Sequence, residues 1–368
     1  MPRALVALLL VTLPSFAPLA RAADGDLDPS FGGTGAFTVP FGPVGSGTLV
    51  RRADGEILAA AIDATGLAFA LYESTGTLDP AFGAGGIKTV PSPGTGNLVE
   101  VALTSTGDIV VLLSDVLARY DADGDVDGGF GSGGVVVLPA CGTQLDPWED
   151  LLLLDDGKIA VSVPTASIDE PSCVMRFDAN GSPDTAFGVN GVATVSNFLI
   201  VSVAAQGDRL LIGGYDAAVP GPGVRRLTTD GALDGAFAAQ PPLDGSRVTA
   251  LDVRPDGTIL TADEKGRVAR LQSNGKPDGT FGVGGLGAAL PPADDSTYSR
   301  RTALAVQRDG RILVGVSETD LSTFIPTDYA FLARYDADGS IDDSFGTHGV
   351  LSRGPGRLGG LALQPDGK

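Results

Sequence analysis

Histidine and cysteine are scarce in this chain of 368 residues, which has only His348, Cys141 and Cys173. A site with several histidine ligands is therefore excluded, and two cysteines alone do not supply the four ligands of a structural zinc site. Any Ser-His-Asp or Cys-His arrangement would have to use His348. The sequence also lacks a nucleophile elbow and a paired metal-ligand motif. We therefore expect no metal, no cofactor and no catalytic residue of these types.

Long hydrophobic runs are also lacking. The longest, from Ala4 to Leu13, follows the basic Arg3 and precedes the small residues Ala20 and Ala22. This order is typical of a secretory signal peptide, and the run is too short to span a bilayer. We predict a signal peptide over residues 1–22 and one repeat domain over residues 23–368. The mature protein is then exported to a periplasmic, cell-surface or secreted location.

Basic residues are few. Without Arg3 and Arg21, the mature chain has 23 basic and 45 acidic residues, a net charge of −22. Such a surface repels nucleic acids and anionic lipids, so we expect neither a nucleic-acid partner nor a membrane span. In an oxidising compartment an even pair of cysteines favours a bridge, and we predict a disulfide between Cys141 and Cys173.

Internal repeats are what the sequence has in abundance. The pattern G-x-x-D-x-x-F occurs seven times, and in six copies a glycine follows the phenylalanine. The aspartates and phenylalanines of the copies, which we interpret as structural repeat residues, are Asp28 and Phe31, Asp79 and Phe82, Asp127 and Phe130, Asp184 and Phe187, Asp234 and Phe237, Asp278 and Phe281, and Asp342 and Phe345. A glycine stands six residues before each phenylalanine. Seven copies of one motif with the same internal spacing indicate a modular fold built from repeats.

Each repeat also has a second turn signal, usually Asp-Gly, between two short apolar runs, as in 302–316. A third run precedes the G-x-x-D-x-x-F motif and a fourth follows it. Four strands per repeat predict an all-β β-propeller of four-stranded blades. We predict seven blades, with 35–41 as the outer strand and 357–364 as the inner strand of an incomplete seventh. On this interpretation the sequence is a fragment of a longer reading frame, truncated in its last blade.

The same motifs resemble the delta-60 repeat family of bacterial exported proteins, which is similar to NHL-type propellers. The resemblance covers nearly everything after residue 22 and rests on D-x-x-F-G, on the arginine eight residues before the aspartate, and on D-G-[KRT]-I. The sequence departs from this pattern at Leu71, which replaces the arginine, and at Ala238, which replaces the glycine after Phe237. The family implies a propeller fold and little about activity.

The acidic stretch 121–127 has two interpretations, a calcium loop or a turn between strands. Only Asp127 recurs in all copies, and Gly124 is at the fourth position rather than the sixth that an EF-hand loop requires. We therefore interpret the stretch as a turn in which the recurrent aspartate accepts backbone N–H groups. The recurrent arginine is expected to form a fork to an aspartate and to fix the blade geometry.

Loop lengths vary in only two places, between the second and third strands and between blades. In an antiparallel blade both emerge on one face, where binding residues are expected. The candidate ligand-binding residues there are Trp148, Asp294, Asp295, Tyr298, Asp320, Phe324 and Asp328. The function we predict is non-catalytic binding of an extracytoplasmic protein or polysaccharide. The alternative is a propeller enzyme of lyase, esterase or dehydrogenase type, with a carboxylate-lined site at the channel mouth.

Overall fold

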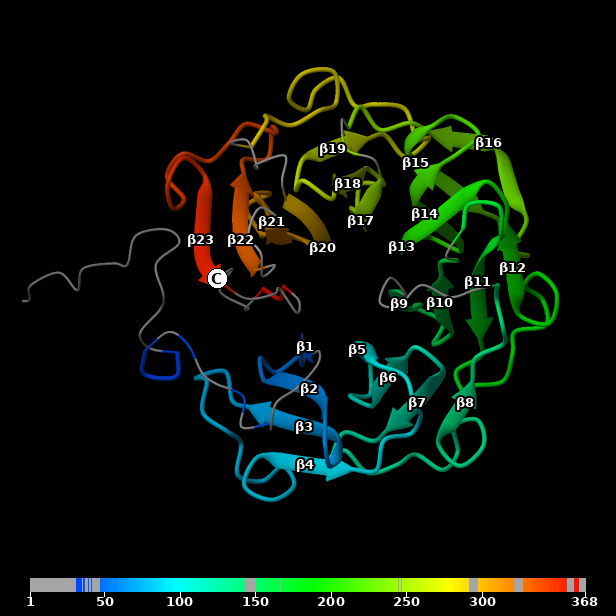
Figure 1. The fold of residues 1–368 in the computed structure, drawn as a ribbon, viewed down its shortest axis with the longest axis vertical. Coiled ribbons are helices and arrows are strands. Elements are labelled where there is room, and N and C mark those ends of the chain that lie inside the picture. The colour runs from blue at the N-terminus through cyan, green and yellow to red at the C-terminus, as the bar shows by residue number, and fades with distance from the viewer. Residues whose placement is uncertain are drawn as a thin grey trace, which may run out of the picture.

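The computed structural model describes residues 31–34, 36, 39, 41, 47–142, 150–165, 167–243, 245, 247–290, 297–320, 327–355 and 361–363. These residues form antiparallel β-sheets arranged around a centre (Figure 1). The predicted signal peptide lies outside the described residues. No helix within the described ranges is long and apolar enough to cross a bilayer.

The first three sheets follow the chain order, and each has four strands. The first consists of β1 (Gly47–Arg51), β2 (Ile57–Asp63), β3 (Gly66–Tyr72) and β4 (Ile87–Val90). The second consists of β5 (Leu98–Leu103), β6 (Ile109–Leu113), β7 (Val116–Tyr120) and β8 (Val135–Val137). The third consists of β9 (Asp150–Leu153), β10 (Ile159–Val163), β11 (Ser172–Phe177) and β12 (Val192–Val195).

The other three sheets complete the arrangement. The fourth consists of β13 (Phe198–Gln206), β14 (Arg209–Asp216), β15 (Gly221–Leu227) and β16 (Leu233–Ala239). The fifth has β17 (Val248–Val253), β18 (Ile259–Asp263) and β19 (Val268–Leu271), and a single bridge from Ala269 to Leu286 takes the fourth place. The sixth consists of β20 (Thr297–Val306), β21 (Ile312–Asp320), β22 (Thr327–Tyr335) and β23 (Val350–Pro355). The first strand of each sheet lies nearest the centre (Figure 1).

The hydrophobic core is divided into layers between neighbouring sheets. Side chains alternate across a strand, so β2 contributes Leu58 and Ala60 to the layer shared with the second sheet, whereas Ala59 faces the other way. Four further layers join the second to the third sheet and so on to the sixth. Each sheet is thus buried only by its neighbours, which is why the sequence must repeat.

The prediction of an all-β propeller is confirmed, but the prediction of seven blades is wrong, because the described residues form six sheets. None of the six sheets includes a described residue of the first motif copy. Instead, Gly32 N–H donates to the Thr75 carbonyl oxygen at 2.7 Å, and Val39 and Phe41 pack against the first sheet. Residues 361–363 are not in a strand. The sequence has one more motif copy than the structure has described sheets. The reason is that the Phe-Gly pair of a copy contacts the following sheet, and Phe31 and Gly32 make this contact with the first sheet.

Candidate functional site: the loop face

The antiparallel order of the strands gives the ring two faces. The turn face carries the tight turns between the first and second strands and between the third and fourth strands of each sheet, such as 52–56 and 121–134. The loop face carries the ends of the strands that are joined by the second-to-third connections and by the crossovers between sheets, such as those of β10 and β11 and of β8 and β9. All the length variation predicted from the sequence falls on the loop face.

On the turn face, the described motif copies share one repeated contact between neighbouring sheets, which we call the junction. In the third sheet, Arg176 Nε donates to Asp184 Oδ2 at 2.7 Å, and the guanidinium stacks 4.3 Å from the centre of the Phe187 ring. Arg176 Nη2 also donates to the carbonyl oxygen of Thr229, in a turn of the fourth sheet, at 2.7 Å. The arginine therefore fixes its own sheet and binds the next one.

The remaining groups of this junction are also engaged within the fold. Asp184 Oδ1 accepts the Ala186 N–H at 3.1 Å, and Lys158 Nζ lies 3.2 Å from Asp184 Oδ2. Burial raises the pKa of Asp184, but the hydrogen bonds from Arg176 and Lys158 outweigh it and hold this pKa below its ordinary value. The carboxylate is thus an ion-pair partner and has no basicity suited to acid–base chemistry near neutral pH.

Two sheets achieve the same junction with different residues, which sequence reasoning did not find. In the first sheet, where Leu71 replaces the arginine, Arg52 from the β1–β2 turn stacks on Phe82 and donates to the carbonyl oxygen of Ala122. In the fourth sheet, Arg226 donates to Gln206 Oε1 at 2.8 Å, and Gln206 Nε2 donates to the carbonyl oxygen of Ser273 at 3.0 Å. Arg52 lies in the β1–β2 turn and Gln206 at the end of β13, so only the fold brings these substitutes into place.

The acidic stretch 121–127 is a turn in the second junction. Asp121 Oδ1 accepts the N–H groups of Asp123 and Asp125, and Asp127 pairs with Arg119 and accepts the Gly129 N–H. Asp125 Oδ1 lies 2.6 Å from Lys88 Nζ of the first sheet. Within the described ranges, no group of three or more His, Cys, Asp or Glu side chains could hold a metal ion.

His348 also belongs to this turn architecture. It has a φ of +51° and directly precedes Gly349, at a position where other copies have a glycine such as Gly284 with a φ of +63°. Its side chain is 84% exposed, and Nδ1 lies 3.9 Å from Asp343 Oδ1. The single histidine therefore occupies a solvent-facing turn position of the repeat motif.

Several acidic residues on the loop face shape the loops themselves. Asp115 accepts hydrogen bonds from Thr95 N, Thr95 Oγ1 and Gly96 N. Burial raises its pKa, but these bonds outweigh burial and the pKa lies below the ordinary value. Asp216 pairs with both Arg225 Nε and Nη2 and accepts the Ala218 N–H. These two carboxylates therefore fix the loop conformation, and their oxygens already accept hydrogen bonds from groups of the protein.

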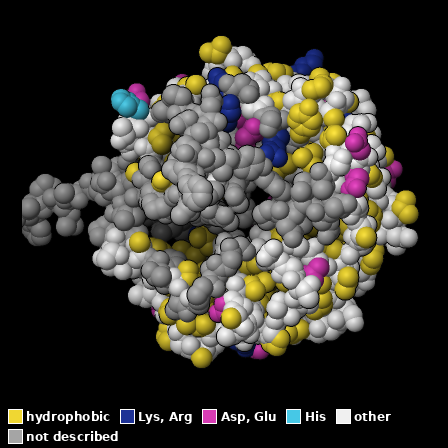
Figure 2. Space-filling model, in the orientation of Figure 1, with side chains coloured by type: hydrophobic (Ala, Val, Ile, Leu, Met, Phe, Trp, Pro, Cys, Tyr) yellow, Lys and Arg dark blue, Asp and Glu magenta, His cyan; other side chains and the backbone are white. Residues whose placement is uncertain are grey.

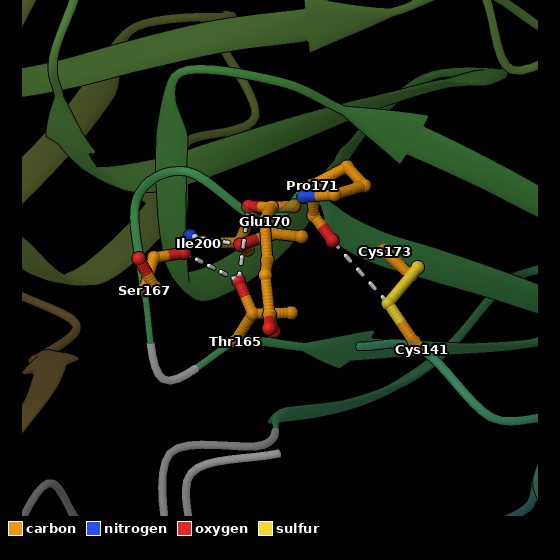
Figure 3. Close-up of a disulfide and its surroundings, with 8 residues drawn as sticks. Cys141, Thr165, Ser167, Glu170, Pro171, Cys173 and Ile200 are labelled. Atoms are coloured by element: carbon orange, nitrogen blue, oxygen red, sulfur yellow. Dashed lines mark hydrogen bonds between the residues drawn. A yellow bond between two sulfur atoms is a disulfide. The ribbon is translucent and has the colours of Figure 1, made fainter. Parts of the chain in front are cut away.

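The predicted disulfide between Cys141 and Cys173 is confirmed and fixes two loop-face segments to each other (Figure 3). Their Cα atoms lie 6.2 Å apart, and both residues are buried. Beside the bridge, Thr165 Oγ1 lies 3.1 Å from the Ser167 carbonyl oxygen and 3.2 Å from that of Glu170, which closes the β10–β11 loop. The bridge therefore fixes the residue after β8 to the start of β11, next to the folded β10–β11 loop.

The structure describes some of the predicted ligand-binding residues and not others. Trp148, Asp294, Asp295 and Phe324 lie outside the described residues. The backbones of Tyr298, Asp320 and Asp328 lie on β20, β21 and β22, where Thr319 pairs with both Tyr298 and Asp328. These three positions thus meet at the loop-face end of the sixth sheet.

Lys and Arg side chains gather near β17 and β18 on the face in Figure 2, whereas acidic side chains are scattered.

Comparison with known proteins supports the fold. Residues 206–237 and 307–345 match the family model described as a domain of unknown function (DUF5122) β-propeller, and both segments end at a motif phenylalanine, Phe237 or Phe345. The chain is thus a propeller-repeat protein, and the delta-60 assignment stays a prediction. No curated protein matches the sequence.

Solved structures are similar at low sequence identity. A quinonprotein alcohol dehydrogenase-like protein from Bacteroides thetaiotaomicron is 14% identical, with a TM-score of 0.50 over 87% of this chain and 70% of that one. A protein of unknown function from Bacteroides caccae is 13% identical, with a TM-score of 0.44 over 83% of this chain and 97% of that one. At such identities the first likeness concerns the fold alone.

Proposed function

We propose that the chain is an exported, non-catalytic propeller that presents its loop face to a protein or polysaccharide partner outside the cytoplasm. The observation that carries this proposal is the contrast between the two faces. Recurrent polar groups of the turn face are engaged in junctions, whereas the loop face carries the insertions that differ from sheet to sheet. Binding residues tend to lie on variable loops held by a rigid scaffold.

The disulfide supports both parts of the proposal. It joins Cys141, which follows β8, to Cys173 at the start of β11, so the beginning of this crossover is fixed to the strand that follows the β10–β11 loop. Preorganised loops lose less conformational entropy when they bind a partner. Disulfides also persist in oxidising compartments, which agrees with export.

The test is a glycan array probed with residues 23–368, followed by hydrogen exchange with the best-bound oligosaccharide. We expect protection in 139–149, 164–171, 288–296 and 320–327. Trp148→Ala should weaken binding by about tenfold, since one aromatic contact contributes on the order of 1–2 kcal/mol. Val189→Ala, which removes a 77% exposed apolar side chain on the turn face, is the matched control and should leave binding unchanged. Protection confined to the turn face would refute the proposal.

A further inference from the structure

The basic residues in the connections between loop-face strand ends belong to one sheet. The chain joins these strand ends through residues 64–65, 91–97, 114–115, 138–149, 164–171, 196–197, 217–220, 240–247, 264–267, 287–296 and 321–326. In these stretches the sequence has three basic residues, Arg247, Lys265 and Arg267. Acidic residues, in contrast, occur in them from Asp115 to Asp295. The positive charge of the connections is therefore concentrated at the fifth sheet.

The fold brings the three basic residues to one end of this sheet. Val248 pairs with Asp263 across β17 and β18. Arg247 and Glu264 lie next to this pair, and Glu264 Oε2 accepts the Arg247 N–H at 3.2 Å. Asp263 N–H donates to the Arg267 carbonyl oxygen at 3.1 Å and closes the β18–β19 turn. This strand end lies where Lys and Arg side chains gather in Figure 2.

The β18–β19 turn is held in place by its own carboxylate and by the sixth sheet. Asp263 is fully buried, and its Oδ1 accepts the N–H groups of Lys265 at 3.0 Å and Arg267 at 2.9 Å. Tyr335 Oη of β22 donates to the Gly266 carbonyl oxygen at 3.2 Å. The backbone that carries the cations is thus ordered before any ligand binds, which lowers the entropic cost of binding.

The charges at this strand end suit an anion. Asp263 lies beneath the turn, whereas Lys265 is exposed and Arg247, Glu264 and Arg267 are half-buried. An arginine has five N–H donors and a lysine has three, so these residues can keep contacts within the protein and also bind a ligand. The arginine fork matches the two oxygens of a carboxylate. At physiological ionic strength the screening length is about 8 Å, so acids elsewhere on the chain act weakly here.

We propose that Arg247, Lys265 and Arg267 bind a carboxylate of an acidic polysaccharide built with uronic acid units. This inference rests on the proposed function and names the ligand class of the loop face. A protein partner fits less well, because a stable interface takes about 800 Å² from each partner and these cations occupy one end of one sheet. A nucleic acid fits less well too, because its closely spaced phosphates would meet the acidic residues of the other connections.

The first test is isothermal titration calorimetry of residues 23–368 with uronate tetramers, namely galacturonate, glucuronate and mannuronate. The fully methyl-esterified tetramers are the neutral control, and tetraglutamate is the peptide control. We expect the best uronate to bind at least about tenfold more tightly than its methyl ester and than tetraglutamate, and to bind more weakly as NaCl is added.

Each other outcome of this titration is informative. Equal binding of the methyl ester would overturn the inference and leave the proposed function standing, because the loop face would then recognise neutral sugars. Binding of tetraglutamate as tight as that of the uronate would assign the cations to an acidic peptide and overturn it. Absence of binding by every uronate would also overturn it, while the glycan array still decides the proposed function.

The second test locates the site with matched variants. Lys265→Gln removes an exposed cation from the β18–β19 turn, and Lys276→Gln removes an exposed cation from the turn face of the same sheet. We expect Lys265→Gln to weaken uronate binding about threefold and Arg267→Gln about tenfold, because hydrogen bonds from an arginine fork are stronger. Lys276→Gln and the charge-conserving Lys265→Arg should bind like the wild type.

Equal affinity of Lys265→Gln and the wild type would overturn the inference, as would an equal loss in Lys265→Gln and Lys276→Gln. Should Arg267→Gln not fold, the two lysine variants still decide, because both side chains are exposed.

Discussion

At the scale of single residues, the recurrent arginine combines three interactions that other side chains make separately. Its planar guanidinium pairs with a carboxylate, stacks on a phenyl ring and donates to a carbonyl group of the next sheet. A lysine has no planar group for stacking and no fork of donors. The spacing of eight residues between arginine and aspartate allowed the fork to be predicted from the sequence. Arg52 and Gln206 could not be predicted, because nothing in their spacing connects them to the motif.

Removal of Arg176 should destabilise the protein more than removal of Arg119. Arg176 and Asp184 have side chains 8% and 6% exposed, whereas those of Arg119 and Asp127 are 17% and 29% exposed. Arg176→Met leaves the buried Asp184 carboxylate with Lys158 as its remaining ion-pair partner and the Ala186 N–H as a donor, and we expect a loss of about 2–4 kcal/mol. Arg119→Met should cost about 1 kcal/mol, because water can solvate Asp127. Urea unfolding measures both, and an equal loss would contradict this explanation.

The junction aspartates should make stability fall in acid. Burial raises the pKa values of Asp184 and Asp342, but hydrogen bonds, including those from Arg176 and Arg334, keep both below the ordinary value. A carboxyl whose pKa is lower in the folded state stabilises the fold above its unfolded pKa of about 3.9, and this contribution is lost as the pH falls through the folded pKa. We expect the urea midpoint to stay nearly constant from about pH 7 to 5 and to fall below about pH 4. The Asp184→Asn variant should be less stable than the wild type at neutral pH. Its stability should also fall less than that of the wild type when the pH is lowered.

At the scale of the structural element, the junction explains why glycine stands six residues before each motif phenylalanine. Gly181 has a φ of +83°, and a Cβ atom there would lie 3.0 Å from both Gly131 N and the Phe130 ring. Gly133 has a φ of +63° but no atom within 4 Å. The first glycine is needed for conformation and for close approach, the second for conformation alone.

Gly181→Ala should therefore cost more than Gly133→Ala. Backbone strain at positive φ applies to both and amounts to about 1–2 kcal/mol. Contact with the neighbouring sheet adds about 1–3 kcal/mol in Gly181→Ala only. Thermal and urea unfolding of the two variants would test this, and equal losses would show that the sheets separate easily at this junction.

The disulfide should stabilise the third sheet and its crossover. It closes a loop with a sequence separation of 32, for which restriction of the unfolded chain predicts about 3–4 kcal/mol. We expect the double variant Cys141→Ser, Cys173→Ser to unfold at lower urea concentration than the wild type. A reductant should lower the urea midpoint of the wild type to that of the double variant and leave the midpoint of the double variant unchanged. No difference under oxidising conditions would contradict a stabilising role.

At the scale of the whole molecule, the sequence was sufficient for the fold class and insufficient for the number of sheets. The constant spacing inside each motif copy reflects a constant local geometry, so four strands per repeat could be inferred. The predicted count was wrong because 35–41 and 357–364 were assigned to an incomplete seventh blade, whereas the described residues form six sheets and Phe31 and Gly32 contact the first of them. The candidate ligand residues were inferred from loop length, which predicts a face and not a site.

The acidic character of the whole chain, with a formal net charge of −20, raises the question of whether calcium stabilises it. The turn carboxylates argue against this, because the oxygens of Asp121 and Asp127 already accept N–H groups or pair with Arg119. We expect a chelator at constant ionic strength to change Tm by no more than about 1 °C, since no folding free energy is linked to the ion. Addition of NaCl without chelator is the control for screening of the net charge. A chelator-induced fall of more than about 5 °C, reversed by calcium and by no other divalent cation, would mean that at least one turn binds calcium.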